Sequence, residues 1–276
     1  MIAAIIPAEN EALTISKVIQ TLLAAGVDLV IPVLNGCRDN SLAVIKHLGQ
    51  GRVQPVNFQE PLGIDVPRAV GAALAYERGA ETILFVDGDM AGEIGDALAG
   101  LVEKVRKNDA QLALTNCYPP DGPAVSSSLA GYLIKVRILL NRTIGLEKEL
   151  GSASPAHGPH AVSRAFLEQI PVRELAVPPV ALALAAKKGL RAAIGASIPH
   201  RQLGSPQKDP AHCHRIAETI IGDCLEALQM YQGKQRSRSF NGVTFLGYHP
   251  QRRFDLLENF LCQQGLFPKV DRKVKD

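Results

Sequence analysis

The sequence lacks several features that would each assign it to a broad class. It offers no long apolar run to cross a membrane, because the run that begins at Met1 is interrupted by Pro7, Glu9 and Glu11. No basic residue precedes Lys17, which does not fit a secretory signal sequence. The five cysteines are an odd number without a Cys-x-x-Cys pair, which favours reduced thiols over a disulfide framework. We therefore expect a cytoplasmic protein without a transmembrane segment.

The composition also excludes an intrinsically disordered chain. Charged residues make up only 21% of the sequence, whereas hydrophobic residues make up 46%. A chain of 276 residues buries roughly 70–75% of its unfolded surface on folding. It therefore needs neither disulfides nor a structural metal to fold.

Basic and aromatic residues are concentrated towards the C-terminus. Residues 231–276 hold nine Lys or Arg against four Asp or Glu, and seven of the thirteen Phe and Tyr residues. The charges are scattered and form no stripe, so they do not indicate a nucleic-acid partner. We interpret residues 231–276 as a C-terminal extension that packs its aromatic side chains on residues 1–230, or on a second copy in a homodimer.

The first 115 residues alternate short apolar runs with helical patterns. The runs predict buried strands at 3–6, 29–34, 52–57, 82–87 and 111–115. Apolar residues three and four apart predict helices over 15–23, 69–76 and 98–105. This alternation predicts an α/β fold with a mostly parallel sheet flanked by helices. Pro32 would remove a hydrogen-bond donor from the second strand, which predicts a bulge or an edge position there.

A turn-rich segment, residues 119–123, ends this alternation. Beyond it, apolar spacing predicts a long helix over 129–144 whose other face carries Lys135, Arg137 and Arg142. Both an ordinary domain helix and a helix on a membrane surface fit that pattern. The remaining patterns predict a loop over 147–160 and helices over 180–188 and 216–230.

Polar residues follow the predicted strands where ligands of open α/β sheets bind, beyond the carboxyl ends of the strands. Asp87-Gly88-Asp89 comes directly after the apolar run 83–86. Carboxylates suit Mg²⁺ or Mn²⁺, which proteins often hold through one or two carboxylates together with substrate phosphates. Gly88 lets a bulky ligand approach the backbone. The structural alternative is a solvated turn in which an aspartate caps the next helix.

Four short motifs occur in the order and spacing of the family 2-like glycosyltransferases with the GT-A fold. They are Pro7-Ala8-Glu9-Asn10-Glu11, Asn35 to Asp39, Gly63 to Gly71, and Val86-Asp87-Gly88-Asp89. The chain resembles this family over residues 1–92 and more loosely over residues 150–205. The resemblance implies a GT-A-like (Rossmann-like) domain over residues 1–230, followed by a C-terminal helical extension. Residues 1–115 would bind the nucleotide-sugar and residues 116–230 the acceptor.

The resemblance also implies roles for single residues. Glu9 and Asp39 would contact the nucleoside, Arg68 the nucleotide end of the site, and Asp87 the ribose side. Asp89 would hold the divalent metal and so take part in catalysis. The full nucleotide-sugar set is Pro7, Ala8, Glu9, Asn35, Asp39, Gly63, Arg68, Asp87 and Gly88. The structural alternatives are helix caps for Glu9 and Asp39 and a surface ion pair for Arg68.

The second half departs from the family pattern at one position. Its segment 158–164 resembles the region that places the acceptor, and the expected acceptor residues are Gly158, His160, Arg164 and Arg201. Inverting members carry an acidic pair that opens a helix, and here the pair falls on Pro178-Pro179. Proline cannot accept a proton, so this departure weakens the case for inversion. Glu174 is the only nearby carboxylate on that loop and is the remaining candidate for a catalytic base.

Residues 198–203 resemble the histidine segment of the retaining branch, which includes glucosyl-3-phosphoglycerate and mannosylglycerate-type synthases. The resemblance implies that His200 joins Asp89 as a metal ligand, since imidazole binds Mn²⁺-like ions. A purely structural hydrogen bond is the alternative. A zinc site at His212-Cys213-His214 is disfavoured, because residues two apart on a helix point to different faces.

These patterns predict sugar transfer from a UDP- or GDP-sugar to a small hydroxylated acceptor, phosphorylated and carboxylated ones included, with Mg²⁺ or Mn²⁺ and with retention of configuration. A sugar-phosphate nucleotidyltransferase would have a Gly-rich basic loop where residues 7–11 stand. A dinucleotide-dependent dehydrogenase would have G-x-G-x-x-G at that place. A relative that binds a nucleotide-sugar without turnover stays open because of Pro178-Pro179.

Overall fold

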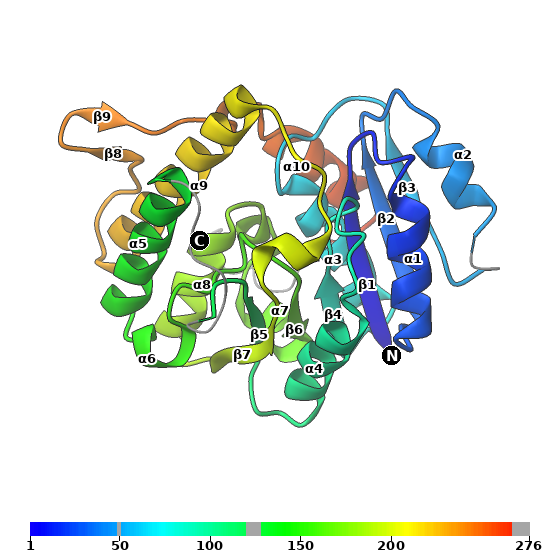
Figure 1. Ribbon diagram of the computed structural model, residues 1–276, viewed down its shortest axis with the longest axis horizontal. Helices are drawn as coiled ribbons and strands as arrows, with labels where there is room; N and C mark the ends of the chain where they lie inside the picture. Colours follow the sequence, from blue (N-terminus) through cyan, green and yellow to red (C-terminus); the bar gives the residue numbers. More distant parts are fainter. Residues whose placement is uncertain (49–50, 120–127, 267–276) are drawn as a thin grey trace.

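A central sheet of seven strands organises the protein, as a computed structural model shows (Figure 1). The structure describes residues 1–48, 51–119 and 128–266. The strand order is β3-β2-β1-β4-β6-β5-β7. The strands are β1 (Ile2–Ala8), β2 (Leu29–Asn35), β3 (Val56–Phe58), β4 (Thr82–Phe85), β5 (Leu112–Asn116), β6 (His160–Ser163) and β7 (Ala192–Ser197). All neighbours are parallel except β6, which is antiparallel to β4 and β5. The predicted mostly parallel α/β fold is confirmed.

Helices cover both faces of the sheet. They are α1 (Ile15–Ala24), α2 (Ser41–Lys46), α3 (Val66–Glu77), α4 (Gly95–Arg106), α5 (Ser128–Thr143), α6 (Glu147–Leu150), α7 (Arg164–Gln169), α8 (Pro178–Lys187), α9 (Pro210–Tyr231) and α10 (Phe254–Gln263). Successive residues of β1 alternate between two cores: Ala3 and Ile5 pack with α3 and α8, whereas Ala4 and Ile6 pack with α1 and α4. This alternation is the two-residue period of a strand that is buried on both faces.

Short elements complete the second half. They are the 3₁₀ turns η1 (Val172–Ala176), η2 (His200–Leu203) and η3 (His249–Gln251), and the strands β8 (Ser239–Phe240) and β9 (Val243–Thr244). The two strands pair into a hairpin that projects beyond α9 (Figure 1). The predicted loop 147–160 contains α6. Of the predicted turn 119–123, residues 120–123 lie outside the described residues. No helix within the described ranges is long and apolar enough to cross a membrane.

The prediction for Pro32 is wrong in its location. The strand β2 lies inside the sheet, between β1 and β3, and its register with β1 runs through Pro32 without a shift. Val30 exchanges hydrogen bonds with Arg52 and Gln54, so Pro32, two residues on, turns its nitrogen towards the same neighbour. Pairing on that side is interrupted between an isolated bridge at Val53 and the start of β3. The missing donor therefore coincides with a gap in the pairing, which also shortens the predicted strand 52–57.

Candidate active site

Two strand ends bring acidic residues together at the carboxyl edge of the sheet. Glu11 follows β1, and Asp87 and Asp89 follow β4. The backbone ties the two loops, because the Gly88 N–H donates to the Pro7 carbonyl over 3.0 Å. A Cβ on Gly88 would lie 3.2 Å from the Cγ of Glu11, so glycine permits the close approach. The structure thus places the Asp-Gly-Asp motif against the end of the first strand.

Lys208, which belongs to no motif in the sequence, completes this cluster. The Nζ of Lys208 lies 3.2 Å from Oδ2 of Asp89 and 3.9 Å from Oε1 of Glu11. Burial alone would lower the pKa of Lys208, but the charges of Asp89 and Glu11 raise it, so the side chain is an ammonium ion. The Oγ of Ser205 donates to Oδ1 of Asp89 over 3.1 Å. The segment after η2 therefore places a positive charge between two carboxylates.

Arg68, at the start of α3, holds the other aspartate. Its Nη2 donates to Oδ1 of Asp87 over 2.8 Å, and its Nη1 donates to the Pro155 carbonyl over 2.8 Å. Its Nε lies 3.4 Å from Oδ1 of Asp65. The guanidinium is buried, so the surface ion pair considered for Arg68 is wrong. Burial raises the pKa of Asp87, Arg68 opposes this, and the charges of Asp89 and Asp65 add to the rise.

The residues expected to contact the nucleoside follow the carboxyl ends of β1 and β2. The amide of buried Asn35 accepts from the Leu62 N–H and lies 3.4 Å from Oε2 of Glu9 and from the Gly63 carbonyl. Asp39 is exposed, and its carboxylate accepts from Ser41 and from the Ala12 N–H. Burial acts to raise the pKa of Asp39, but these hydrogen bonds lower it. Asp39 thus has a structural role in addition to an accessible carboxylate.

The comparisons with known proteins identify the family. The model of glycosyl transferase family 2 matches residues 3–170. The chain belongs to glycosyl transferase family 2. No curated protein matches the sequence significantly.

Solved structures of one enzyme share the fold of this family 2 glycosyltransferase. Glucosyl-3-phosphoglycerate synthase from Mycobacterium tuberculosis, in complex with Mn²⁺ and uridine-diphosphate-glucose, matches with a TM-score of 0.62 and 18% identity. That match covers 86% of this chain and 81% of the other. The same synthase in complex with Mn²⁺, uridine-diphosphate-glucose and phosphoglyceric acid matches with a TM-score of 0.59 and 16% identity, over 86% and 81% of the two chains. The predicted GT-A-like fold is confirmed.

Of the residues expected to bind the acceptor in this family 2 chain, Arg164 lies apart from Gly158 and His160. Arg164 follows β6, which runs antiparallel to β4, so Arg164 lies at the opposite end of β4 from Asp87. There Arg164 donates to the backbone carbonyl of Tyr76, and its guanidinium stacks over the Tyr76 ring. His160 is buried against Phe85, with ring centroids 4.7 Å apart. Arg201 is exposed, and Gly158 packs against the end of β5.

Glu174 and His200 also have partners that the sequence did not reveal. Glu174, in η1, accepts from Arg236 of the C-terminal extension. His200 opens η2, and its Nδ1 lies 3.0 Å from Nε2 of His157. Over the described ranges, only one group of three or more possible ligands has its atoms within 4.8 Å of one another, and it contains neither His200 nor Asp89. The expected metal site has only two protein ligands, Asp89 and His200, and it stays a prediction.

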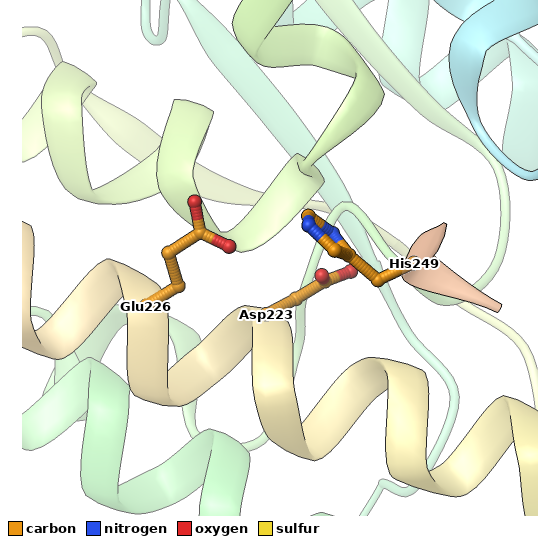
Figure 2. Close-up of side chains that lie close together, drawn as sticks. All are labelled: Asp223, Glu226 and His249. Atoms are coloured by element: carbon orange, nitrogen blue, oxygen red, sulfur yellow. The ribbon is translucent and has the colours of Figure 1, made fainter. Parts of the chain in front are cut away.

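That group is Asp223 and Glu226 of α9 with His249 of η3 (Figure 2). Its carboxylates are already neutralised by arginines. Arg252 donates to both oxygens of Asp223 over 2.7 Å, and Arg238 donates to Asp223 and Glu226. Burial and these guanidinium groups lower the pKa of His249 to about 4. The cluster is therefore an ion-pair network and offers no free charge to a metal.

The same network reaches the nucleotide end of the site. Arg252 donates to Oδ2 of Asp65 over 3.1 Å and to the Ile64 carbonyl over 3.3 Å. The Arg253 N–H donates to the Leu62 carbonyl over 2.8 Å. A Cβ on Gly63 would collide with the Gln251 carbonyl, and Gly63 has a φ of +82°. The C-terminal extension thus holds the loop 60–65, which connects β3 to α3, through hydrogen bonds and close packing. No pattern in the sequence predicts a contact between this loop and residues 251–253.

Proposed function

We propose that this protein transfers a sugar from a nucleotide-diphosphate donor to a small hydroxylated acceptor, with a divalent cation at Asp89. The observation that carries the proposal is the Lys208 ammonium between Asp89 and Glu11. It lies beyond the carboxyl ends of β1 and β4, where ligands of open α/β sheets bind. Membership of glycosyl transferase family 2 supports sugar transfer. The similar synthase was solved with Mn²⁺, uridine-diphosphate-glucose and phosphoglyceric acid, which supports this choice of donor, cation and acceptor.

The chemistry of the donor set fits a divalent cation. Asp89 and Glu11 offer hard carboxylate oxygens, and they already hold one positive charge from Lys208. A bound Mg²⁺ or Mn²⁺ would supply charge neutralisation of the diphosphate leaving group. Arg68 fixes the orientation of Asp87 beside it, and Asn35 and Glu9 would orient the nucleoside. Lys208, once displaced from Asp89, would remain available to the diphosphate.

The first prediction tests the assignment of Asp89. In the Asp89→Asn variant, the gain in affinity for UDP or GDP that Mn²⁺ provides should fall by roughly tenfold or more, because a metal ligand is lost. Isothermal titration calorimetry with and without Mn²⁺ measures this gain. The matched control is Asp96→Asn, which changes an exposed carboxylate in the first turn of α4. An unchanged Mn²⁺ dependence in Asp89→Asn contradicts the proposal.

We also propose that the anomeric configuration is retained. Pro178 and Pro179 open α8, where inverting relatives would carry their base, and Arg236 engages the carboxylate of Glu174. Loss of a general base costs ~10²–10⁴-fold in rate. The Glu174→Gln variant should instead keep kcat within a few-fold of the wild-type value. NMR of the product reads its anomeric configuration, and a rate loss of the general-base size with an inverted product would contradict retention.

Three earlier expectations stay predictions. They are the cytoplasmic location, the division at residue 230 and the homodimer formed through the extension. A nucleotidyltransferase and a non-catalytic relative are separated from the proposal by turnover against UDP- and GDP-sugars.

A further inference from the structure

Two carboxylates beyond the ends of β1 and β4 each turn one oxygen towards the same lysine. The Ser205 hydroxyl donates to Oδ1 of Asp89 over 3.1 Å. The Thr14 hydroxyl donates to Oε2 of Glu11 over 3.0 Å. The second oxygens, Oδ2 of Asp89 and Oε1 of Glu11, lie 3.2 Å and 3.9 Å from the Nζ of Lys208. The hydroxyls thus orient the two carboxylates, and their remaining oxygens converge on one positive charge.

The position of this ammonium group suits a divalent cation. The side chains of Asp89 and Glu11 are only 15% and 16% exposed, so solvent screens their repulsion weakly. Without a positive charge between them, two mostly buried carboxylates would face each other, which is costly. Lys208 supplies that charge in this structure. A divalent cation at Asp89 would supply it as well, and the two cannot occupy the same place.

Lys208 belongs to an exposed segment that is fixed at both ends. At one end, the Gly92 N–H donates to the Leu203 carbonyl over 2.9 Å, which holds the end of η2 beside the loop that follows β4. At the other end, Asp209 caps α9. Residues 204–208 between these ends are exposed and have no regular secondary structure. The ammonium group can therefore leave the carboxylates without unfolding a helix or a strand, while it stays near the donor site.

We propose that Lys208 and the divalent cation exclude each other at Asp89, and that Lys208 thereby couples cation binding to nucleotide binding. The inference rests on the proposed function, which places the cation at this carboxylate. A cation that binds alone has to displace the ammonium group from its counter-charge. A nucleoside diphosphate offers that group phosphate oxygens, so the displacement costs less when the nucleotide is bound. Cation and nucleotide should therefore raise each other's affinity by one common factor, and part of this factor is due to Lys208.

Calorimetry on the full-length Lys208→Met variant tests the exclusion. Methionine keeps most of the apolar stem of lysine and removes its charge. The variant should bind Mn²⁺ alone roughly three- to tenfold more tightly than the wild type, because no ammonium group competes for Asp89. With Mn²⁺ present it should bind UDP or GDP several-fold more weakly, because the diphosphate has lost a cationic partner. The factor by which Mn²⁺ raises nucleotide affinity should fall accordingly. A merely structural lesion would weaken both ligands and would not strengthen Mn²⁺ binding.

Two control variants separate the position of the charge from its loss. Lys208→Arg keeps the charge and should retain weak binding of Mn²⁺ alone. Lys188→Met removes an exposed lysine at the end of α8 and should leave both affinities at their wild-type values. Unchanged or weaker binding of Mn²⁺ alone by Lys208→Met, or an undiminished coupling between Mn²⁺ and the nucleotide, would overturn the inference.

The Asp89→Asn variant distinguishes failure of this inference from failure of the proposed function. If Asp89→Asn loses its Mn²⁺ dependence while Lys208→Met binds Mn²⁺ as the wild type does, only the inference fails. If nucleotide binding by Asp89→Asn keeps its full Mn²⁺ dependence, the cation is not held at Asp89, and the proposed function and the inference fail together.

Discussion

His160 is the residue whose environment differs most from its expected role. Its ring is buried and stacks on Phe85, and burial together with the Arg68 charge lowers its pKa to about 3. It therefore stays neutral at neutral pH, and its Nδ1 has no hydrogen-bond partner among the residues that the structure describes. An ordinary histidine in the unfolded chain has a pKa of about 6.5. Between these two values the unfolded state binds one proton more than the folded state.

This difference gives a stability prediction with a definite sign. As pH falls from 6.5 towards 3, His160 should reduce the free energy of unfolding by roughly 1.4 kcal/mol per pH unit. The His160→Phe variant preserves the stacking on Phe85 and removes the titration. Urea unfolding at pH 6.5, 5.5 and 4.5 should show a wild-type loss steeper than the variant's by about that amount. Parallel slopes would show that His160 does not titrate as the structure indicates.

Single residues also show how far sequence reasoning reaches. Asp87 and Asp89 could be predicted because they follow an apolar strand directly, and strand ends gather at one edge of a parallel sheet. The burial of Arg137 could not be predicted, because a charged side chain suggests a helix face that contacts solvent. Yet Arg137 stands four residues after Leu133 and three before Leu140, which is the spacing of the apolar face, and the structure buries it. Lys208 lies on a segment without periodicity, so its contact with Asp89 gave no signal.

At the scale of elements, the loop 60–65 depends on the distant segment 249–253. Arg252 has a fully buried side chain and joins Asp65 of the loop to Asp223 of α9. Removing one partner of a buried ion pair typically costs ~3–5 kcal/mol, because the remaining charges stay buried. The loop precedes Arg68, which orients Asp87. Loss of the contacts between Arg252 and this loop should therefore weaken donor binding as well as lower the stability of the fold.

The Arg252→Met variant tests this coupling. We expect a lower melting temperature, faster amide hydrogen exchange over residues 60–65, and a higher KM for the donor with a smaller change in kcat. The matched control is Arg253→Met, whose side chain is 40% exposed and pairs with Glu60 and Asp255 at the surface. Exposed pairs contribute about 1 kcal/mol or less, so this variant should behave almost as the wild type. Unchanged exchange over 60–65 in Arg252→Met would contradict the coupling.

Elements with a strong local period were predictable, and those defined by distant pairing were not. The helices over 15–23, 98–105 and 129–144 were found from apolar spacing, and α1, α4 and α5 confirm them. The antiparallel strand β6 has only four residues and takes its place from β4 and β5, which flank it. The helix α9 begins at Pro210, six residues before the predicted start, because Asp209 caps it by accepting from the His212 N–H. An Asp followed by Pro is a start signal for a helix, so the sequence itself indicates this cap.

At the scale of the whole molecule, the basic and aromatic side chains of the extension contact residues 1–230 of the same chain. Arg236, Arg238 and Arg252 neutralise carboxylates of α9 and η1, and Phe260 contacts Phe58 with ring centroids 5.4 Å apart. Leu257 and Leu261 of α10 belong to the core that covers one face of the sheet. The extension therefore completes both a core and an ion-pair network. Its composition, which set it apart in the sequence, reflects the acidic surface that it covers.

This arrangement predicts that residues 1–231 do not form a stable protein alone. Truncation there removes three buried leucines, Leu257, Leu261 and Leu266, whose loss costs ~2–5 kcal/mol each when they are cut back singly, and leaves Asp223 without its two arginines. Whole domains are stable by only ~5–15 kcal/mol. A chain that ends at residue 231 should therefore show no cooperative thermal unfolding by circular dichroism, whereas one that ends at residue 266 keeps these contacts and should unfold cooperatively. A sharp transition in the shorter chain would show instead that the glycosyltransferase domain folds without its extension, and that the grip on loop 60–65 adjusts the site without holding the fold.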